Sequence, residues 1–172
     1  MKPPLRIGIL LLAVALALFM AAFQRAYSPV SFGATIPYLQ PDQWRDMPPY
    51  HLSPQSLKIA FSTMNGTPIN IYILNSQEFQ EWEDTGTLNA VINIENQSVF
   101  IGTYDIASRD FYTLIAHNPN NETEGIRIDL TLYGFEKDLT LTTTIIAVVG
   151  IVTPTIYYIS GKAKAHSHKT EP

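Results

Sequence analysis

The chain has 172 residues, of which 46% are hydrophobic and 15% are charged, and its formal net charge is −4. It contains no cysteine, which excludes disulfide bonds, thiolate metal sites and a cysteine nucleophile. Residues 24–138 hold six basic and fourteen acidic side chains, so this middle region has no electrostatic reason to bind nucleic acid. The two ends are apolar and basic, which is typical of membrane segments with cytoplasmic flanks.

The N-terminal segment, residues 1–23, is predicted to be a membrane-spanning helix. Its apolar run has 17 residues and would extend roughly 26 Å as a helix, close to the thickness of a bilayer core. A signal peptide has the same layout, but no pair of small residues marks a good cleavage site, and we expect the helix to be retained.

Ala13, Ala17 and Ala21 recur at every fourth position, a spacing that lets helices approach closely in lipid. The alternative is that alanine is simply frequent in such helices.

Residues 24–55 form a connector that contains six prolines. Proline at this density forbids long helices and central strands. The aromatic side chains of Tyr38 and Trp44 argue against a disordered linker. We therefore expect an extended segment that lies against the folded domain, with one edge strand near residues 30–36.

Residues 56–138 are predicted to fold as an all-β domain. Hydrophobic and polar residues alternate in most of its segments, as strands with one buried face require. The expected strands cover residues 57–64, 69–74, 88–94, 98–106, 111–116 and 126–135. Short strands at near-regular spacing indicate a β-sandwich of two antiparallel sheets.

Two local signals refine the strand prediction. Asn65-Gly66 is a strong hairpin signal, and it predicts that residues 57–64 and 69–74 pair with each other. Gly102 interrupts its strand and suggests a bulge at that position.

One short helix is expected inside this domain, over residues 77–84. Phe79 and Trp82 are three positions apart and would dock on the sheet. Glu78 and Glu81 also share one face, as a calcium site or an acid–base pair would need. A helix face exposed to water has the same pattern, so both interpretations stay open.

Residues 139–159 form the second predicted membrane helix. These 21 residues carry no charged side chain and would extend roughly 31 Å as a helix. Pro154 should kink the helix, and together with Gly150 it offers a packing site for another helix. The apolar runs of both predicted spans contain no Asp, Glu, Lys, Arg or His, which argues against an ion or proton pathway. A small, basic tail, residues 160–172, follows.

Three Asn-x-Ser/Thr sequences begin at Asn65, Asn96 and Asn121, each on a predicted turn. Loops expose asparagine to a glycosyltransferase in an extracytoplasmic compartment, so these are the candidate glycosylation sites. The alternative is that Asn, Gly, Ser and Thr simply favour turns.

No catalytic residue, cofactor or metal site is expected. His51 and His117 lack a second histidine at the spacing of a metal site. The sequence also has no Gly-rich phosphate loop and no G-x-S-x-G nucleophile motif.

The order of features in residues 57–135 resembles the lumenal GOLD domain of the emp24/p24 cargo-receptor family. The resemblance is carried by strand segments and the aromatic residues beside them: 57–64, 69–74, Phe79, Trp82, Gly102, Tyr104, 111–114, Asn118 and 126–135. It implies a jelly-roll or GOLD-like sandwich on a membrane stalk. The family's cysteine pair is absent, and no functional residue is transferred.

Together these features predict a two-pass membrane protein with both termini in the cytoplasm and residues 24–138 outside it. The expected role is non-catalytic, as an accessory or interaction subunit. Its expected partners are membrane lipid and either other membrane subunits or further copies of itself.

Two other functions are considered. The sandwich could bind carbohydrate or metal ions through Tyr38, Trp44, Trp82 or the helix at residues 77–84. An enzyme would require His51, His117 and a carboxylate to converge in one cleft.

Overall fold

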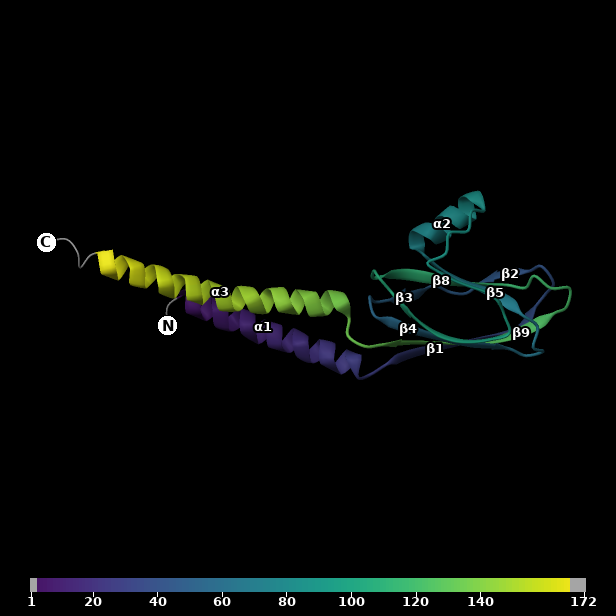
Figure 1. The fold of residues 1–172 in the computed structure, drawn as a ribbon, viewed down its shortest axis with the longest axis horizontal. Coiled ribbons are helices and arrows are strands. Elements are labelled where there is room, and N and C mark those ends of the chain that lie inside the picture. The colour runs from purple at the N-terminus through teal and green to yellow at the C-terminus, as the bar shows by residue number, and fades with distance from the viewer. Residues whose placement is uncertain (1–2, 168–172) are drawn as a thin grey trace. The chain divides into compact units, whose positions relative to one another are not determined.

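The computed structural model describes the backbone of residues 3–167 and the side chains of residues 3–160. The chain forms two compact units, a helical unit made of the two terminal segments and a sandwich unit, Ser28–Gly134 (Figure 1). The sandwich unit is therefore an insertion between the helices of the helical unit.

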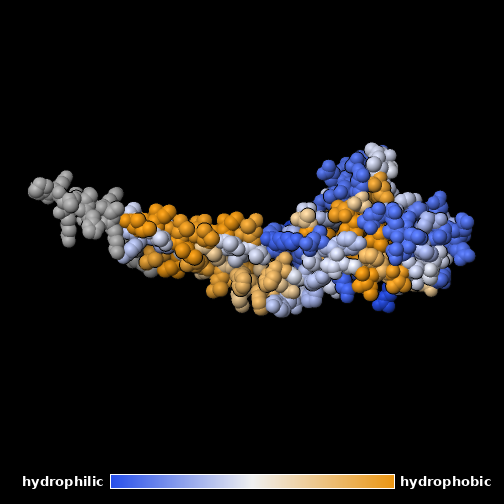
Figure 2. Space-filling model, in the orientation of Figure 1, coloured by the Kyte–Doolittle hydropathy of each residue, from blue (hydrophilic) through white to orange (hydrophobic). Residues whose placement is uncertain are grey.

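The helical unit contains α1 (Pro3–Ala26) and α3 (Lys137–Ser167). Pro3–Ala26 and Lys137–Ser160 are both long and apolar enough to cross a membrane. Figure 2 shows hydrophobic residues along much of both helices. The helix α3 continues past residue 159 into the predicted tail, and the last five tail residues lie outside the described residues.

The sandwich unit contains nine strands and one helix, α2 (Ser76–Thr85). The strands are β1 (Val30–Leu39), β2 (Trp44–Asp46), β3 (Tyr50–Leu52), β4 (Ser56–Thr63), β5 (Ile69–Asn75), β6 (Ile92–Gln97), β7 (Val99–Asp105), β8 (Asp110–His117) and β9 (Glu124–Tyr133). One sheet has the order β1-β9-β4-β7, and the other has the order β2-β8-β5-β6 with β3 also paired to β8. Every pairing is antiparallel. The predicted architecture of two antiparallel sheets is confirmed.

The core lies between the two sheets. In β4, Leu57, Ile59 and Phe61 alternate with more exposed residues, as predicted, and face the other sheet. They meet Ile71 and Ile73 of β5 in one cluster of buried side chains. Full burial of an aliphatic side chain of this size stabilises a fold by about 1.5–3 kcal/mol. This cluster is therefore the main source of stability for a domain that has no disulfide.

The strand order places the turns at two ends of the sandwich. The chain enters and leaves at one end, because Val30 at the start of β1 pairs with Leu132 near the end of β9. The opposite end, called here the distal end, holds the connections β4–β5, β6–β7 and β8–β9.

The Asn65-Gly66 turn does not form the predicted hairpin. The strand β4 pairs with β7 and β9 in one sheet, whereas β5 pairs with β6 and β8 in the other. The turn, in which Gly66 has a φ of +82°, therefore carries the chain from one sheet to the other. A turn motif specifies a reversal of direction, but the buried faces of the strands decide which strands pair. The apolar faces of β4 and β5 can point into the same core only if the two strands lie in different sheets.

Three other details differ from the prediction. The connector contains the predicted edge strand, β1, but also the short strands β2 and β3. The strand expected at residues 88–94 begins later, as β6, because Leu88 and Ala90 pack instead beside α2. Gly102 causes no bulge, since the register between β4 and β7 is unbroken. A Cβ at Gly102 would lie 2.5 Å from the Phe100 ring, so the glycine makes room for an aromatic side chain.

A buried carboxylate stabilises the distal end. Glu124 is fully buried, and its carboxylate accepts hydrogen bonds of 2.8–3.0 Å from the backbone N–H groups of Met64, Asn65, Thr67 and Gly125. Burial raises the pKa of the Glu124 carboxyl, but the N–H donors outweigh this effect and hold the pKa below its ordinary value. The ionised side chain thus supplies the acceptors that the sheet-to-sheet turn lacks.

Candidate functional site

The helix α2 is fixed at both ends on the outer face of the second sheet. At its start, the Asn75 side chain accepts a 2.9 Å hydrogen bond from the Glu78 N–H, and the Glu78 carboxylate accepts a 3.1 Å bond from the Asn75 N–H. At its end, Gly86 adopts a left-handed conformation with φ +72°. This reciprocal cap engages the Glu78 carboxylate. Glu78 is therefore committed to the helix start, and the predicted pair with Glu81 is not a free acid–base pair.

The aromatic face of α2 packs on the sheet as predicted. Phe79 and Trp82 contact a small buried cluster of Tyr72, Leu74 and Ile115, which lies on the side of the sheet opposite the main core. This second cluster explains why β5 and β8 are buried on both faces. It sets the height of α2 above the sheet.

Trp44 extends this cluster toward the edge of the sheet. Its indole stacks on the imidazole of His117, with centroids 4.0 Å apart and an interplanar angle of 9°. It also stacks on Tyr72 at 5.7 Å and lies 6.1 Å from Trp82. The Trp44 side chain is still 40% exposed. The structure therefore joins two of the three aromatic residues proposed from the sequence and leaves part of the cluster open to solvent.

Tyr38, the third aromatic candidate, lies apart. It belongs to β1 in the other sheet and is 69% exposed. The sequence could not separate it from Trp44, because both lie in the same proline-rich segment.

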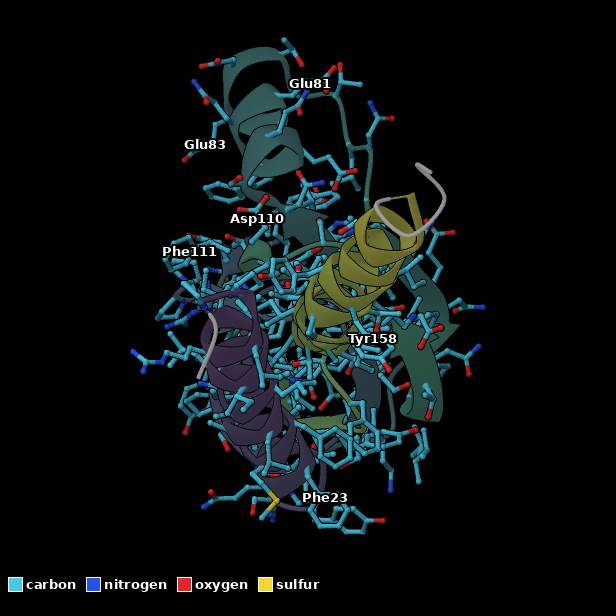
Figure 3. All side chains as sticks on the ribbon, turned by 90° about the vertical axis from the view of Figure 1, so that its left-hand side faces the viewer. Phe23, Glu81, Glu83, Asp110, Phe111 and Tyr158 are labelled. Atoms are coloured by element: carbon cyan, nitrogen blue, oxygen red, sulfur yellow. The ribbon has the colours of Figure 1, made fainter. Side chains whose placement is uncertain are left out.

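A shallow hollow of ≈480 Å³ opens between α2 and β2. It is lined by two aromatic residues, Phe79 and Trp82, two acidic residues, Asp46 and Glu83, and Gly86. Figure 3 shows Glu83 and Glu81 projecting from α2 in different directions. The hollow combines flat apolar surfaces with hydrogen-bond acceptors, which is the combination that binds polar ligands with an apolar face.

The two internal histidines do not converge. His117 Nε2 lies 3.3 Å from Asp42 Oδ1 at the distal end. His51 on β3 pairs with Phe111 at the start of β8, and its ring lies edge-on to that phenyl group at 5.2 Å. Because Phe111 and His117 are six positions apart on one strand, the two histidines are separated by about 20 Å. The cleft that the enzyme hypothesis requires is therefore not formed by these histidines.

The helical unit pairs α1 with α3 through small residues. A Cβ added to Gly8 would lie 2.8 Å from the Gly150 carbonyl oxygen and 2.9 Å from the Pro154 ring, so only glycine fits at this contact. Ala15 and Ala22 are the buried alanines of α1. At the other end of the pair, Arg25 Nη1 lies 2.8 Å from the buried carboxylate of Glu136. The pairing is antiparallel, since the start of α1 meets the later part of α3.

The packing residues predicted from the sequence take two different positions. Gly150 and Pro154 are used inside the chain, against Gly8. Ala13, Ala17 and Ala21 lie on the exposed side of α1, away from α3. Whether these alanines contact another helix stays a prediction.

The three candidate glycosylation asparagines are all exposed and lie at the distal end. Asn65 sits in the β4–β5 turn, where its side-chain amide donates a 3.3 Å hydrogen bond to the Thr123 carbonyl oxygen. Asn96 has a φ of 54° at the end of β6, and Asn121 lies in the β8–β9 loop. Their modification stays a prediction.

The sequence did not indicate Tyr72, His117 or Asp46 as parts of one site. Tyr72 alternates in a strand pattern, and nothing local shows that it faces a helix. The pairing of β2 with β8 joins segments that are far apart in sequence, and single-sequence patterns carry no information on such pairings.

No protein-family model matches the chain, and no curated protein matches it. Among solved structures, the chain is similar to the pre-peptidase C-terminal domain of a collagenase from Bacillus anthracis, with a TM-score of 0.43, 10% identity and coverage of 59% of this chain and 87% of that one. It is also similar to PliG of Aeromonas hydrophila, a periplasmic inhibitor of g-type lysozyme (TM-score 0.41, 4% identity, coverage 60% and 85%). A third is the Yersinia pseudotuberculosis-derived mitogen (TM-score 0.39, 11% identity, coverage 64% and 90%). These distant likenesses define no family, and the GOLD resemblance stays a prediction.

Proposed function

We propose that the protein is a non-catalytic, membrane-anchored interaction subunit that displays its sandwich outside the cytoplasm. One observation carries the proposal: Ser28–Gly134 is inserted between two apolar helices that are each long enough to span a membrane. A chain that crosses twice returns to its starting side, so both termini lie on one side and the sandwich on the other. The basic ends favour the cytoplasm for the termini.

The chemistry of the sandwich supports a binding role rather than a catalytic one. His51 on β3, opposite the start of β8, lies far from His117 at the end of β8, and the buried Glu124 accepts hydrogen bonds from backbone N–H groups. Among the described residues, no group of three or more His, Cys, Asp or Glu side chains is placed to hold a metal ion. What the sandwich offers instead is surface: an aromatic hollow, exposed loops and an edge strand.

The helical unit supports assembly with other membrane helices. Its internal contact uses Gly8, Gly150 and Pro154, which leaves Ala13 and Ala17 on a side of α1 that faces away from α3. Small side chains on such a side allow close approach by a further helix, whose contacts in lipid depend on packing.

The test is the size and composition of the full-length protein after mild solubilisation from its own membrane. We expect a complex larger than one chain, containing either further copies or another membrane protein. Ala17→Leu should weaken this complex without unfolding the chain, because the added side chain projects from the outward side of α1. Leu16→Ala, an adjacent exposed position, is the control. A strictly monomeric, partner-free protein would contradict the proposal.

A second candidate function is carbohydrate binding at the aromatic hollow. The observation that favours it is the hollow lined by Phe79, Trp82, Asp46 and Glu83. The partly exposed Trp44 lies 6.1 Å from Trp82. Sugar rings stack on flat aromatic surfaces and donate hydroxyl hydrogens to carboxylates.

The chain has only two tryptophans, and both lie in this cluster. Intrinsic fluorescence therefore reports on the site directly. Titration with a panel of soluble oligosaccharides should change the tryptophan emission of the wild type but not of Trp82→Phe combined with Glu83→Gln. Glu81→Gln, on the same helix and outside the hollow, should leave the response intact. No response to any sugar would remove this candidate.

A further inference from the structure

The strand β7 forms an exposed apolar edge of the sandwich. Among the described residues it pairs only with β4. Val99 and Ile101 are 63% and 70% exposed, and Ile101 is the most exposed large hydrophobic side chain of the sandwich unit. An edge strand with outward apolar side chains is a template for pairing with another strand.

The other edges of the two sheets are protected against such pairing. In β1, Pro37 removes a backbone donor and the register with β9 shifts between Ile36 and Leu39. The strands β2 and β3 have three residues each. The strand β6 is interrupted by a register shift opposite β5 and presents Glu95 outward. The strand β7 keeps one register over its seven residues and is uncharged from Val99 to Tyr104. Residues 30–36 of β1 are also regular and uncharged, but the alternating exposed positions Ser31, Gly33 and Thr35 carry small or polar side chains.

The register with β4 identifies the free backbone groups of β7. The Thr63 N–H donates to the Ser98 carbonyl oxygen at 2.8 Å, and the Ile106 N–H donates to the Gln55 carbonyl oxygen at 2.9 Å. Backbone hydrogen bonds in an antiparallel pair alternate along the strand, so the even-numbered residues of β7 face β4. The N–H and C=O groups of Val99, Ile101 and Thr103 therefore point away from the sheet.

We propose that two copies of this protein join at β7, by antiparallel pairing about Ile101, into one continuous sheet. This inference rests on the proposed function as an interaction subunit and names one of its surfaces. A two-fold axis at Ile101 places Ile101 beside Ile101 of the second copy and Val99 beside Thr103 of the second copy. The backbone N–H and C=O groups of all three residues point away from β4, so a single register pairs these groups on both strands. A second copy is the occupant because the outward groups of Val99, Ile101 and Thr103 match one another when the strand is rotated about Ile101, which is the self-complementarity that a two-fold interface requires.

The side chains of this arrangement are also complementary. On the outer face, Ala60 neighbours Ile101 in the register of β4 with β7. The joined face then carries the row Ala60, Ile101, Ile101, Ala60 across the two copies. A hollow of ≈330 Å³ beside Val99 and Ile101 leaves room for the added side chains. Asp105 falls opposite Gln97 of the second copy, so no like charges oppose each other.

The test uses the absence of native cysteine. Full-length Ile101→Cys protein in lipid vesicles is oxidised with copper–phenanthroline and run on a non-reducing gel. Residues directly opposite in a hydrogen-bonded pair have Cα atoms about 5.5 Å apart, within disulfide range. We expect most of the Ile101→Cys protein to migrate as a dimer. Val99→Cys should cross-link at least fivefold less, because the two positions are then about 13 Å apart.

Two further variants keep the test decisive. Thr35→Cys, which is exposed on β1 at the opposite edge of the same sheet, should not cross-link. Ile101→Lys should abolish dimers detected by native mass measurement, since it places two ammonium groups at the axis. Equal cross-linking of Val99→Cys and Ile101→Cys, or no cross-linking of Ile101→Cys, would overturn the inference. If the protein then still co-purified with another membrane protein, the proposed function would stand and only this surface would be rejected.

Discussion

The indole of Trp44 lies flat on the imidazole of His117, with ring centroids 4.0 Å apart. The two residues belong to paired strands, since Trp44 on β2 is directly opposite His117 on β8. The stack therefore attaches the proline-rich segment after β1 to the second sheet. The stack also forms the solvent-exposed end of the aromatic cluster beside α2.

Because of this stack, we expect Trp44 to stabilise the fold more than its partial exposure to solvent would suggest. Trp44→Ala should lower the free energy of unfolding by about 1–2 kcal/mol, because it removes the contacts with His117, Tyr72 and Trp82. Tyr38→Ala should change it by less than about 0.5 kcal/mol, since Tyr38 is 69% exposed. The measurement is denaturant unfolding of the detergent-solubilised protein, followed by far-ultraviolet circular dichroism. Equal effects of the two substitutions would contradict the role of the stack.

Glu124 should make the sandwich sensitive to acid. Its pKa is lowered in the folded protein, so its stabilising effect is present above the ordinary glutamate pKa and is lost as the pH falls through the lowered value. Glu124→Gln should cost about 1–3 kcal/mol at neutral pH, because it leaves N–H groups of the turn poorly paired.

The difference between Glu124→Gln and the wild type should shrink as the pH falls through the lowered pKa of Glu124, where the native carboxylate becomes protonated. Unfolding curves at neutral and acidic pH measure it. Glu122→Gln, exposed in the same loop, is the control and should show no such pH dependence. A Glu124→Gln deficit that persisted unchanged at acidic pH would show that charge is not what the turn requires.

The contact between the two long helices depends on Gly8. Gly8→Val would place side-chain atoms against the Gly150 carbonyl oxygen, where even a Cβ would lie at 2.8 Å. Overpacking of this kind costs about 1–3 kcal/mol. The melting temperature in detergent should fall for Gly8→Val and stay unchanged for Ala17→Val, which faces away from α3. If Gly8→Val were as stable as the wild type, the two helices would not pack as described.

The cap of α2 should account for about 1 kcal/mol of stability. Asn75→Ala removes the side-chain oxygen that accepts the Glu78 N–H, but it keeps the residue-75 backbone N–H that donates to the Glu78 carboxylate. It should also loosen Trp82 and shift its fluorescence to the red. Asn89→Ala, exposed in the loop after the helix, is the matched control. An unshifted spectrum for Asn75→Ala would indicate that packing alone holds α2.

The sequence predicted the local features of this protein well and its long-range pairings poorly. The length of the uncharged apolar runs located α1 and α3, and the alternation of apolar and polar residues located β4 and β9. The Asn65-Gly66 turn misled the prediction, since turn chemistry does not reveal that the next strand belongs to the other sheet. The same limit hid the site: Trp44 and His117 meet only through the pairing of β2 with β8.

Glu124 shows a second limit of the sequence. A glutamate between polar loop residues is expected to be solvated, yet Glu124 is fully buried and accepts hydrogen bonds from several N–H groups of the β4–β5 turn. No local pattern marks a carboxylate whose partners come from another loop.

The central claim is that the sandwich and the two termini lie on opposite sides of a membrane. The direct measurement is labelling of single-cysteine variants in intact cells with a membrane-impermeant maleimide, which the cysteine-free chain permits. Asn121→Cys should be labelled in intact cells, and Lys164→Cys only after the membrane is permeabilised. Protection of Asn121→Cys together with labelling of Lys164→Cys in intact cells would contradict the account.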